Sequence, residues 1–317
     1  MPELPNITSI YFDPTTDFGF KKLFGEEANK DLLMDFLNSL LPSHHQIASL
    51  TFQKTEQLPD HSEERKSVYD IYCENINGEK FIVEMQKSKM TYMVDRTVYY
   101  CTFPIQRQAK RGKWNFKLNR VYTIGILDFE YDSKLEHWKE RQLLRPFNLR
   151  DNNGVLMTDN LQFLFLQLPY FTKTESELVT QFDKWCYFLR NLETFDHIPN
   201  ILNEPIFMKA FDVAEISNMD DGDYILYQIS KSKKYDMEVL ADEAEERGME
   251  IGLAKGIEKG MEKGMEIGLA KGMEKNSTNV VLTAYSQGNS PNLISQFTGI
   301  PLDSVLNIIQ NHNNNKG

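Results

Sequence analysis

The sequence predicts an α/β protein in which helices flank a mixed central sheet, followed by a helical C-terminal extension. Three observations support this prediction. Runs typical of strands and of amphipathic helices alternate over the first 130 residues. Two later runs, 121–129 and 161–168, are nearly continuously apolar, as in strands buried on both faces. From about residue 235 a glycine-spaced repeat replaces these patterns, so the strand-containing part ends before it.

The helices are predicted from apolar residues at helical spacing. Residues 17–41 predict one helix, which ends before Pro42. Its apolar face consists of Leu32, Leu33, Phe36, Leu37 and Leu40. The other elements expected are a first strand at 47–53, a helix at 91–110 with a kink at Pro104, and helices at 176–193 and 205–215.

A β-hairpin is predicted around Asn77-Gly78, between strands at 68–74 and 80–86. Each arm carries a carboxylate near its open end, Asp70 on the first and Glu84 on the second. The two side chains share a face only if they are paired in the same register. The loop length therefore decides whether the hairpin brings the two carboxylates together.

The hydrophobic pattern favours a three-residue loop. A two-residue loop would place Asp70 opposite Met85, whereas a three-residue loop places it opposite Glu84. Only the second register gives one wholly apolar face, because a one-residue slip moves a strand's side chains to the other face. That face holds Tyr69, Ile71, Cys73, Phe81, Val83 and Met85, and the other holds Val68, Asp70, Tyr72, Ile82, Glu84 and Gln86. We expect Gly78 to adopt the left-handed conformation that closes such a loop.

Two carboxylates side by side repel each other unless a cation lies between them. A divalent ion with oxygen ligands is the natural partner for such a pair. The alternative is a solvated hairpin face, on which an acidic pair is commonplace.

A basic stretch follows the hairpin, although the chain carries a formal net charge of −11. No acidic residue occurs between Arg96 and Asp128. The stretch carries Arg107, Lys110, Arg111, Lys113, Lys117 and Arg120, interleaved with Trp114 and Phe116. Phosphate contact is one interpretation, and a solvated charged surface is the other.

The remaining composition excludes some classes of protein. No apolar run reaches about 18 residues, so no transmembrane helix or membrane partner is expected. The first residues carry no basic and apolar signal pattern, which leads us to expect a cytoplasmic protein. The three cysteines, Cys73, Cys101 and Cys186, lack metal-ligand spacing and are expected to be reduced and buried.

The C-terminal third contains two distinct patterns. Glycine recurs at every fourth residue from 248 to 272. Close helix–helix approach in a homo-oligomer and a flexible, partly helical linker both fit this repeat. Residues 277–311 predict three short helices with turns at Gly288 and Gly299, a helix-turn-helix-like module that either contacts DNA or serves packing. The expected parts are 1–235, 236–276 and 277–317.

These residues resemble the recombination-promoting nuclease (transposase) family of the PD-(D/E)XK nuclease superfamily. Asp70 followed by Glu84-Met85-Gln86 is similar to the D…(D/E)-x-K signature of that superfamily, with glutamine in the place of lysine. The resemblance covers most of the chain. The motifs that carry it are DFGFKKLFG (17–25), DIYCENINGEKFIVEMQ (70–86) and DRTVYY (95–100), together with the glycine repeat and the terminal helical module.

The resemblance implies a restriction-endonuclease-like core of α-β-β-β-α-β order and metal-dependent cleavage of DNA. It implies that Asp70, Glu84 and the backbone carbonyl of Met85 bind Mg²⁺ or Mn²⁺, and that Gln86 stands in the place of the catalytic lysine. Accessory roles are expected for Asp17 as a further carboxylate and for Lys66 or Lys89 as a nearby positive charge. Phosphate contacts are expected from Arg96, Arg107, Lys110, Arg111 and Lys113.

The expected function is that of a metal-dependent DNA endonuclease. The alternative is a catalytically inactive nuclease-fold protein that binds DNA or a protein partner, and both the net charge of −11 and Gln86 favour it. Strand transfer by an active transposase is a third possibility, which only the family name supports.

Overall fold

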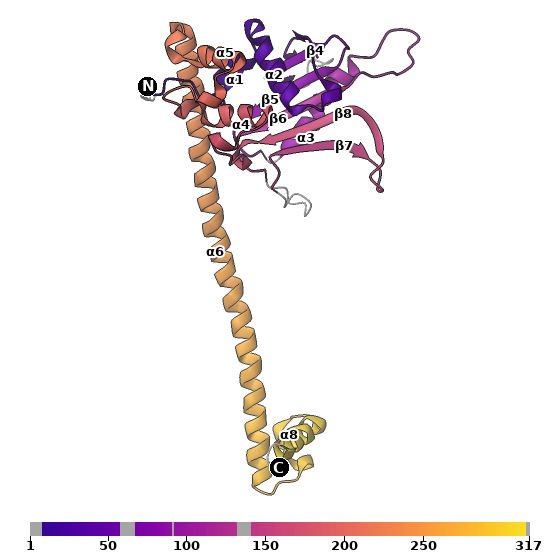
Figure 1. Cartoon of the computed structure of the whole chain (residues 1–317). Coiled ribbons are helices and arrows are strands. Elements are labelled where there is room, and N and C mark those ends of the chain that lie inside the picture. The colour runs from indigo at the N-terminus through magenta and orange to yellow at the C-terminus, as the bar shows by residue number, and fades with distance from the viewer. Residues whose placement is uncertain (1–7, 58–66, 91, 132–140, 315–317) are drawn as a thin grey trace. The chain divides into compact units, whose positions relative to one another are not determined.

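The computed structural model describes residues 8–57, 67–90, 92–131 and 141–314. Its strands are β1 (Leu50–Phe52), β2 (Glu56–Gln57), β3 (Ser67–Val68), β4 (Ile71–Asn75), β5 (Lys80–Gln86), β6 (Val121–Leu127), β7 (Leu144–Arg150) and β8 (Leu156–Gln167). Six of them form one sheet in the order β1-β4-β5-β6-β8-β7, and β2 and β3 form a separate pair (Figure 1). The sheet is mixed, because β6 is parallel to β5 and β8 while the other pairs are antiparallel.

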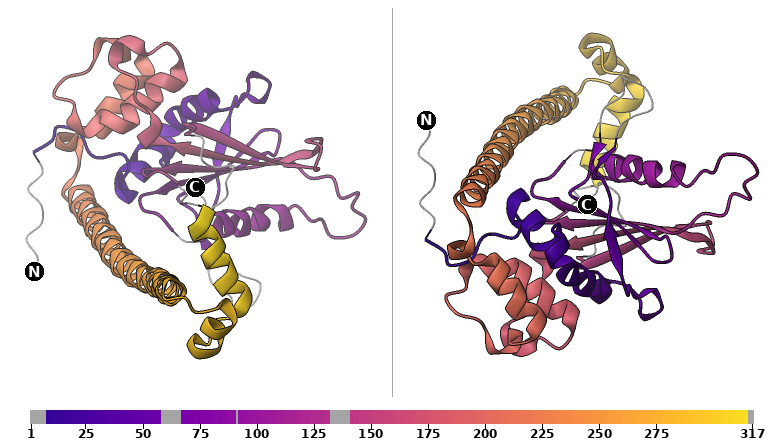
Figure 2. Two further views of the ribbon diagram at one scale, coloured as in Figure 1. Left: turned by 90° about the horizontal axis from the view of Figure 1, so that it is seen from below. Right: turned by 90° about the horizontal axis from the view of Figure 1, so that it is seen from above.

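Helices cover both faces of this sheet, as predicted (Figure 2). The helices of this part of the chain are α1 (Asp17–Phe24), α2 (Lys30–Leu40), α3 (Met93–Gln106), α4 (Gln181–Asn191) and α5 (Pro205–Ala214). The larger core joins one face of the sheet to α1, α2, α4 and α5. At its centre Trp185 packs against Phe24, Phe36 and Phe207, with ring centroids 4.8 to 5.8 Å apart. Helix α3 covers the opposite face.

The prediction of a single helix over 17–41 is wrong, because the helix is interrupted at Gly25. Helix α1 ends there, and a short 3-10 turn separates it from α2. A Cβ atom at Gly25 would lie 2.8 Å from the carbonyl oxygen of Lys21, so only glycine fits this close approach. The side-chain amide of Asn29 donates a hydrogen bond to the carbonyl of Lys22 at 2.9 Å and holds the turn closed.

Strand β7 was missed, and β8 is longer than the predicted 161–168. The sequence of β7, LRPFNLR, contains a proline and two arginines and shows no apolar run. Proline is tolerated there because β7 is an edge strand of the sheet. Strand β6 pairs only with the apolar half of β8, from Leu161 onward, whereas β7 pairs with this half and also with the polar first half.

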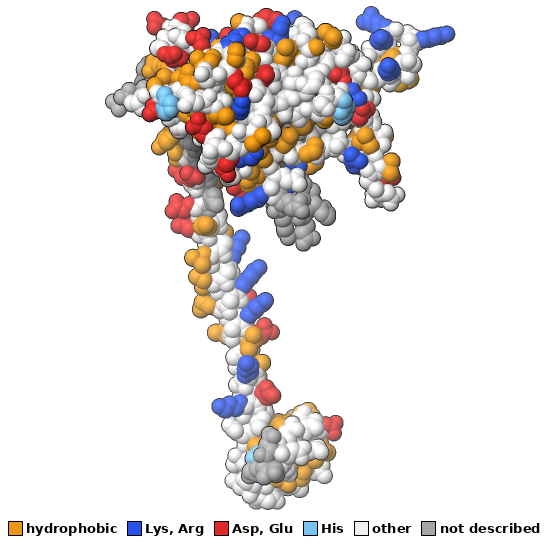
Figure 3. All heavy atoms as spheres, in the orientation of Figure 1, with side chains coloured by type: hydrophobic (Ala, Val, Ile, Leu, Met, Phe, Trp, Pro, Cys, Tyr) orange, Lys and Arg blue, Asp and Glu red, His pale blue; other side chains and the backbone are white. Residues whose placement is uncertain are grey.

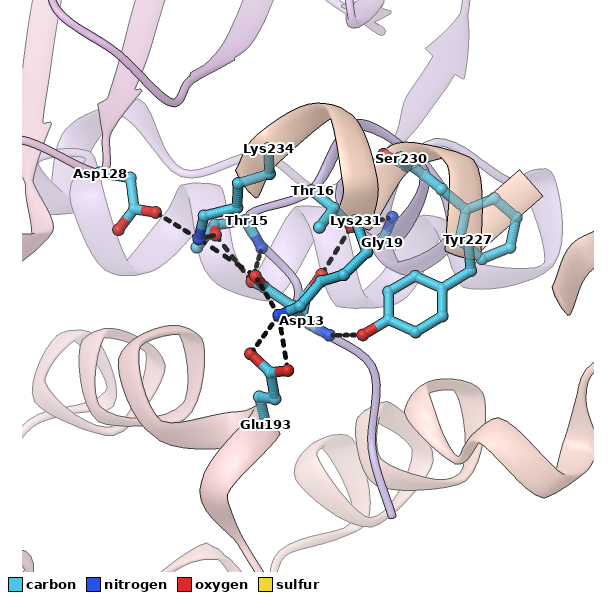
Figure 4. A network of polar contacts seen from close by, with 11 residues as sticks. Asp13, Thr15, Thr16, Gly19, Asp128, Glu193, Tyr227, Ser230, Lys231 and Lys234 are labelled. Carbon is cyan, nitrogen blue, oxygen red and sulfur yellow. Dashed lines mark hydrogen bonds and ion pairs between the residues drawn. The ribbon is translucent and has the colours of Figure 1, made fainter. Parts of the chain in front are cut away.

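The first turns of α6 (Asp221–Ser286) are attached to the sheet-containing part through the buried carboxylate of Asp13 (Figure 4). Lys231 and Lys234 on α6 each place their ammonium nitrogen 3.1 Å from Asp13 Oδ2. The backbone amide of Asp13 also donates to the hydroxyl of Tyr227 at 2.9 Å. Burial would raise the pKa of Asp13, but the two lysines together with hydrogen bonds from Thr15 lower that pKa to about 2.

The chain divides into two compact units, Met1–Ala241 and Asp242–Gly317, and α6 runs through the boundary between them. In the second unit the end of α6 packs with α7 (Pro291–Thr298) and α8 (Leu302–Asn314) around a small core of Val281, Ala284, Ile294, Val305 and Ile309. The turns predicted at Gly288 and Gly299 are confirmed, with φ of 89° and 73°. The glycine repeat is helical, and its apolar side chains are exposed. The three-part division of the chain stays a prediction.

Two predictions from composition can be compared with the structure. Cys73, Cys101 and Cys186 are buried free thiols, as expected. In the part of the chain that the structure describes, no helix is long and apolar enough to cross a membrane. The cytoplasmic location stays a prediction.

Candidate active site

The hairpin formed by β4 and β5 has the register that the alternation predicts. Ile71 pairs with Val83 and Cys73 pairs with Phe81, which corresponds to a three-residue loop. The backbone amide of Gly78 donates to the carbonyl of Asn75 at 3.0 Å, and Gly78 has φ of 75°. The left-handed glycine therefore closes the loop as expected.

The two carboxylates meet where the first arm bends. Asp70 lies at this bend, between the end of β3 and the start of β4. Its backbone amide donates to Glu84 Oε1 at 3.2 Å. In return, Asp70 Oδ2 accepts a hydrogen bond from the backbone amide of Met85 at 2.8 Å. The two arms thus hold each other's carboxylates in place.

Because the chain bends at Asp70, one residue of the hairpin lies on the other face from the one predicted. Tyr69 was expected on the same face as Ile71, but it lies in the opposite cluster, against Tyr72 and Tyr100. Its hydroxyl donates to the carbonyl of Tyr100 on α3 at 2.9 Å. A strict two-residue alternation does not continue through a bend, which explains the error. The predicted polar face is also largely buried, because α3 packs on it.

Burial makes this pair of carboxylates costly in the absence of a cation. The side chain of Glu84 is 8% exposed and that of Asp70 is 19% exposed. Burial raises the pKa of both groups, and the negative charge of Asp70 raises that of Glu84 further. Two cations offset the repulsion: Lys21 Nζ lies 3.7 Å from Asp70 Oδ1, and Arg96 donates to Glu84 Oε2 at 3.3 Å.

A small cavity lies beside Glu84, with Gln86, Arg96 and Thr123 among its lining residues. The side-chain amide of Gln86 donates to Glu84 Oε2 at 3.2 Å. The hydroxyl oxygen of Thr123 is buried and has no hydrogen-bond partner in the described part of the chain. The cavity measures about 10 Å³, which is roughly the space of one water molecule. The hydroxyl of Thr123 is therefore available to hydrogen-bond to a water or ligand in this cavity.

The chain is similar to a known protein family. A model of the PD-(D/E)XK nuclease family transposase matches residues 14–244, which include the whole hairpin and α3. The chain belongs to this family. No curated protein and no solved structure matches it. The mixed six-stranded sheet with flanking helices fits the fold of a PD-(D/E)XK family member.

The donor set of this family member suits a hard divalent cation. Asp70 and Glu84 supply carboxylate oxygens, the ligands that Mg²⁺ and Mn²⁺ prefer. The carbonyl of Gln86 accepts from the amide of Asp128 beyond β6. Since successive carbonyls of a strand point in opposite directions, the carbonyl of Met85 is directed toward Asp70. Among the described residues no group of three or more histidine, cysteine, aspartate or glutamate side chains is placed to hold a metal ion.

Accessory roles in the PD-(D/E)XK site were predicted for Asp17, Lys66 and Lys89. Asp17, at the first turn of α1, is linked to the pair through Lys21, whose ammonium group lies 2.9 Å from Asp17 Oδ1. Lys89 is exposed beyond the end of β5. Lys66 lies outside the described residues. The sequence reasoning missed Lys21, although its spacing of four residues from Asp17 on a predicted helix was a usable signal.

The predicted phosphate-binding residues fall into two groups. Arg96 lies in the site, where its guanidinium group is 4.8 Å from the ring centroid of Tyr100. The others are exposed on the loop between α3 and β6, and they are Arg107, Lys110, Arg111 and Lys113. Figure 3 shows a group of basic side chains that projects from this side of the molecule. Gln108 and Asn119 tie the two ends of this loop together through two hydrogen bonds. Arg120 is instead engaged with Glu79 and Asp159.

Proposed function

We propose that this protein is a divalent-metal-dependent DNA endonuclease that hydrolyses phosphodiester bonds. Asp70, Glu84 and the carbonyl of Met85 would hold Mg²⁺ or Mn²⁺. A bound ion polarises a phosphoryl oxygen and lowers the pKa of a coordinated water. The observation that supports this proposal best is the largely buried carboxylate pair, which meets at the bend of the hairpin and is held by reciprocal hydrogen bonds.

The chain's own groups then bind and orient the reactants. The guanidinium group of Arg96 is held over Tyr100 next to Glu84. Because guanidinium groups form strong hydrogen bonds to phosphate, Arg96 would bind a phosphate oxygen of the substrate there. Gln86 orients a water by hydrogen bonding but contributes no charge. The hydroxyl of Thr123 supplies a further partner for a water in the same cavity. Strand transfer is not part of the proposal, because cleavage chemistry alone does not join ends.

The experiment that tests this proposal is cleavage of supercoiled plasmid by the purified protein in Mg²⁺, in Mn²⁺ and in EDTA. Nicking that requires the metal supports the proposal.

The second candidate function, an inactive nuclease-fold protein that binds DNA or a protein partner, is favoured by one observation: Gln86 is neutral and already donates to Glu84. Binding of DNA without cleavage in either metal would establish this alternative.

We infer that the loop carrying Lys110, Arg111 and Lys113 binds DNA phosphates. Replacing all three by glutamine is expected to weaken binding to every DNA sequence alike, because interactions with phosphates carry no sequence information. The slope of log K against log salt should become shallower by about 0.9 for each phosphate that the variant no longer neutralises. Fluorescence anisotropy at several salt concentrations measures both effects. The double variant Lys30→Gln/Lys209→Gln, which removes one lysine from α2 and one from α5, serves as control. An unchanged slope in the triple variant would show that the loop is only a solvated surface.

We also propose that the second unit serves assembly through the glycine-repeat helix. A chain that ends after Ala244 keeps Lys231 and Lys234, which attach α6 to the first unit. It is expected to cleave DNA at the rate of the full chain, because no residue of the candidate site lies beyond 244. Light scattering should show a smaller oligomer than the full chain forms. A shortened protein that folds and binds metal but does not cut would contradict this division.

A further inference from the structure

The candidate site has a positive charge next to Asp70 that the D…(D/E)-x-K pattern does not contain. Lys21 on α1 places its ammonium nitrogen 3.7 Å from Asp70 Oδ1 and 2.9 Å from Asp17 Oδ1. Helix α1 is fixed at its start by Thr16, whose hydroxyl accepts from the backbone amide of Gly19 at 3.0 Å. The ammonium group is therefore carried to the carboxylates by an ordered helix.

The site needs such a charge, because the group at position 86 is neutral. Gln86 is turned toward Glu84, to which its amide donates a hydrogen bond. In the described part of the chain, the cations paired with the two carboxylates are Lys21 and Arg96. Arg96 is restrained by the ring of Tyr100 and the sulfur of Met90. Lys21 has a flexible stem and is 41% exposed, so its ammonium group can move from Asp70 to a phosphate group.

The side chain of Lys21 also lines a cleft that is open to solvent. This cleft, between α1 and the first turns of α6, has a volume of about 490 Å³. Basic side chains predominate among its charged lining residues, which are Asp17, Lys21, Lys22, Glu26, Lys87 and Lys233. Lys22 forms an ion pair with Asp223 at 2.8 Å and links α1 to α6. Lys87 lines the same cleft, but the ion pair with Asp70 is made by Lys21.

We propose that Lys21 is a catalytic residue of this nuclease: its ammonium group contacts the scissile phosphate and supplies the positive charge that Gln86 lacks. This inference rests on the proposed function. In the hydrolysis, the water oxygen forms a bond to phosphorus and the bond from phosphorus to the leaving oxygen breaks. The water gives one proton to solvent, and the leaving oxygen takes one from solvent. Lys21 keeps its proton throughout and stabilises negative charge on the phosphoryl oxygens.

The test measures single-turnover cleavage in Mg²⁺ and DNA affinity in EDTA for the wild type and four variants. Lys21→Gln is expected to lower the cleavage rate about 100-fold, the usual effect of removing one preorganised charge stabiliser. Its DNA affinity should stay close to that of the wild type, since many other basic groups still bind the DNA backbone. Lys21→Arg should retain part of the activity. Lys30→Gln, which removes the lysine paired with Glu27 at the start of α2, should change nothing.

A compensating variant makes the test specific to charge. If Lys21 replaces the lysine missing at position 86, then Lys21→Gln/Gln86→Lys should cleave at least about tenfold faster than Lys21→Gln. A wild-type rate in Lys21→Gln, or a defect that lies wholly in DNA affinity, would overturn the assignment of Lys21 while leaving the nuclease intact. A wild-type protein that does not cleave in any metal would instead refute the proposed function itself.

Discussion

Asp70→Asn and Glu84→Gln are each expected to lower metal-dependent plasmid cleavage about a thousandfold. Each substitution keeps the size of the side chain and removes one charged oxygen ligand. A bound metal contributes several kcal/mol to stabilising the transition state, and about 4 kcal/mol corresponds to roughly three orders of magnitude in rate. Glu74→Gln, on the same hairpin but paired with Lys80, is the matched control and should cleave normally. Either site variant cleaving at the wild-type rate, above a metal-free blank, would defeat the assignment.

The same two variants should fold at least as well as the wild type in EDTA. An asparagine at position 70 can still accept the hydrogen bond from the amide of Met85. Loss of one negative charge removes the repulsion between two buried carboxylates. The thermal midpoint without metal is therefore expected to be unchanged or higher. This result would separate a catalytic defect from a folding defect.

Asp13→Ala is expected to cost about 3–5 kcal/mol of stability, the usual effect of removing one partner from a buried ion pair. Asp13 is 4% exposed and binds Lys231 and Lys234 at 3.1 Å. Its removal leaves the two lysine ammonium groups partly buried and short of one anion. Urea unfolding of the chain ending after Ala244 measures the loss. The control is Asp31→Asn at an exposed pair with Lys209, where the expected change is below about 1 kcal/mol. An equally small change for Asp13→Ala would show that this network does not attach α6.

The pKa of Asp13 also gives this network a pH dependence. Its pKa is about 2 in the folded protein, against an ordinary value of 3.8. A carboxyl group whose pKa is lowered by folding stabilises the folded state above its unfolded pKa, and this stabilisation is lost as the pH falls through the folded value. The contribution of roughly 2 kcal/mol should therefore disappear between about pH 4 and pH 2. Asp13→Asn should lack this part of the acid transition.

The sequence could predict the register of the hairpin because both of its signals are local. The alternation of apolar residues and the position of Gly78 identify one pairing, and that pairing is observed. The same reasoning failed at Tyr69, since a pattern of period two contains no signal for a bend. It also missed β7, because an edge strand that carries Pro146 needs no apolar run.

The parts of the site that could not be predicted depend on contacts between residues that are far apart in the sequence. Lys21 approaches Asp70 only because α1 packs beside the hairpin. Asp13 and Lys234 are separated by more than 200 residues, and neither has a pattern around it that indicates the other. Arg96 was expected to bind phosphate, but its pairing with Glu84 depends on how α3 packs across the sheet. Such contacts follow from the tertiary fold and not from local periodicity.

The central claim is that Asp70 and Glu84 form a divalent-metal site. Anomalous diffraction from a crystal soaked in Mn²⁺ tests it most directly, because it locates the ion without relying on activity. We expect one strong peak within about 2.2 Å of an oxygen of each carboxylate and of the Met85 carbonyl. We expect that peak to be absent from a crystal of Glu84→Gln treated in the same way. A peak elsewhere in the molecule with none at this pair, or no peak at all, would contradict the account.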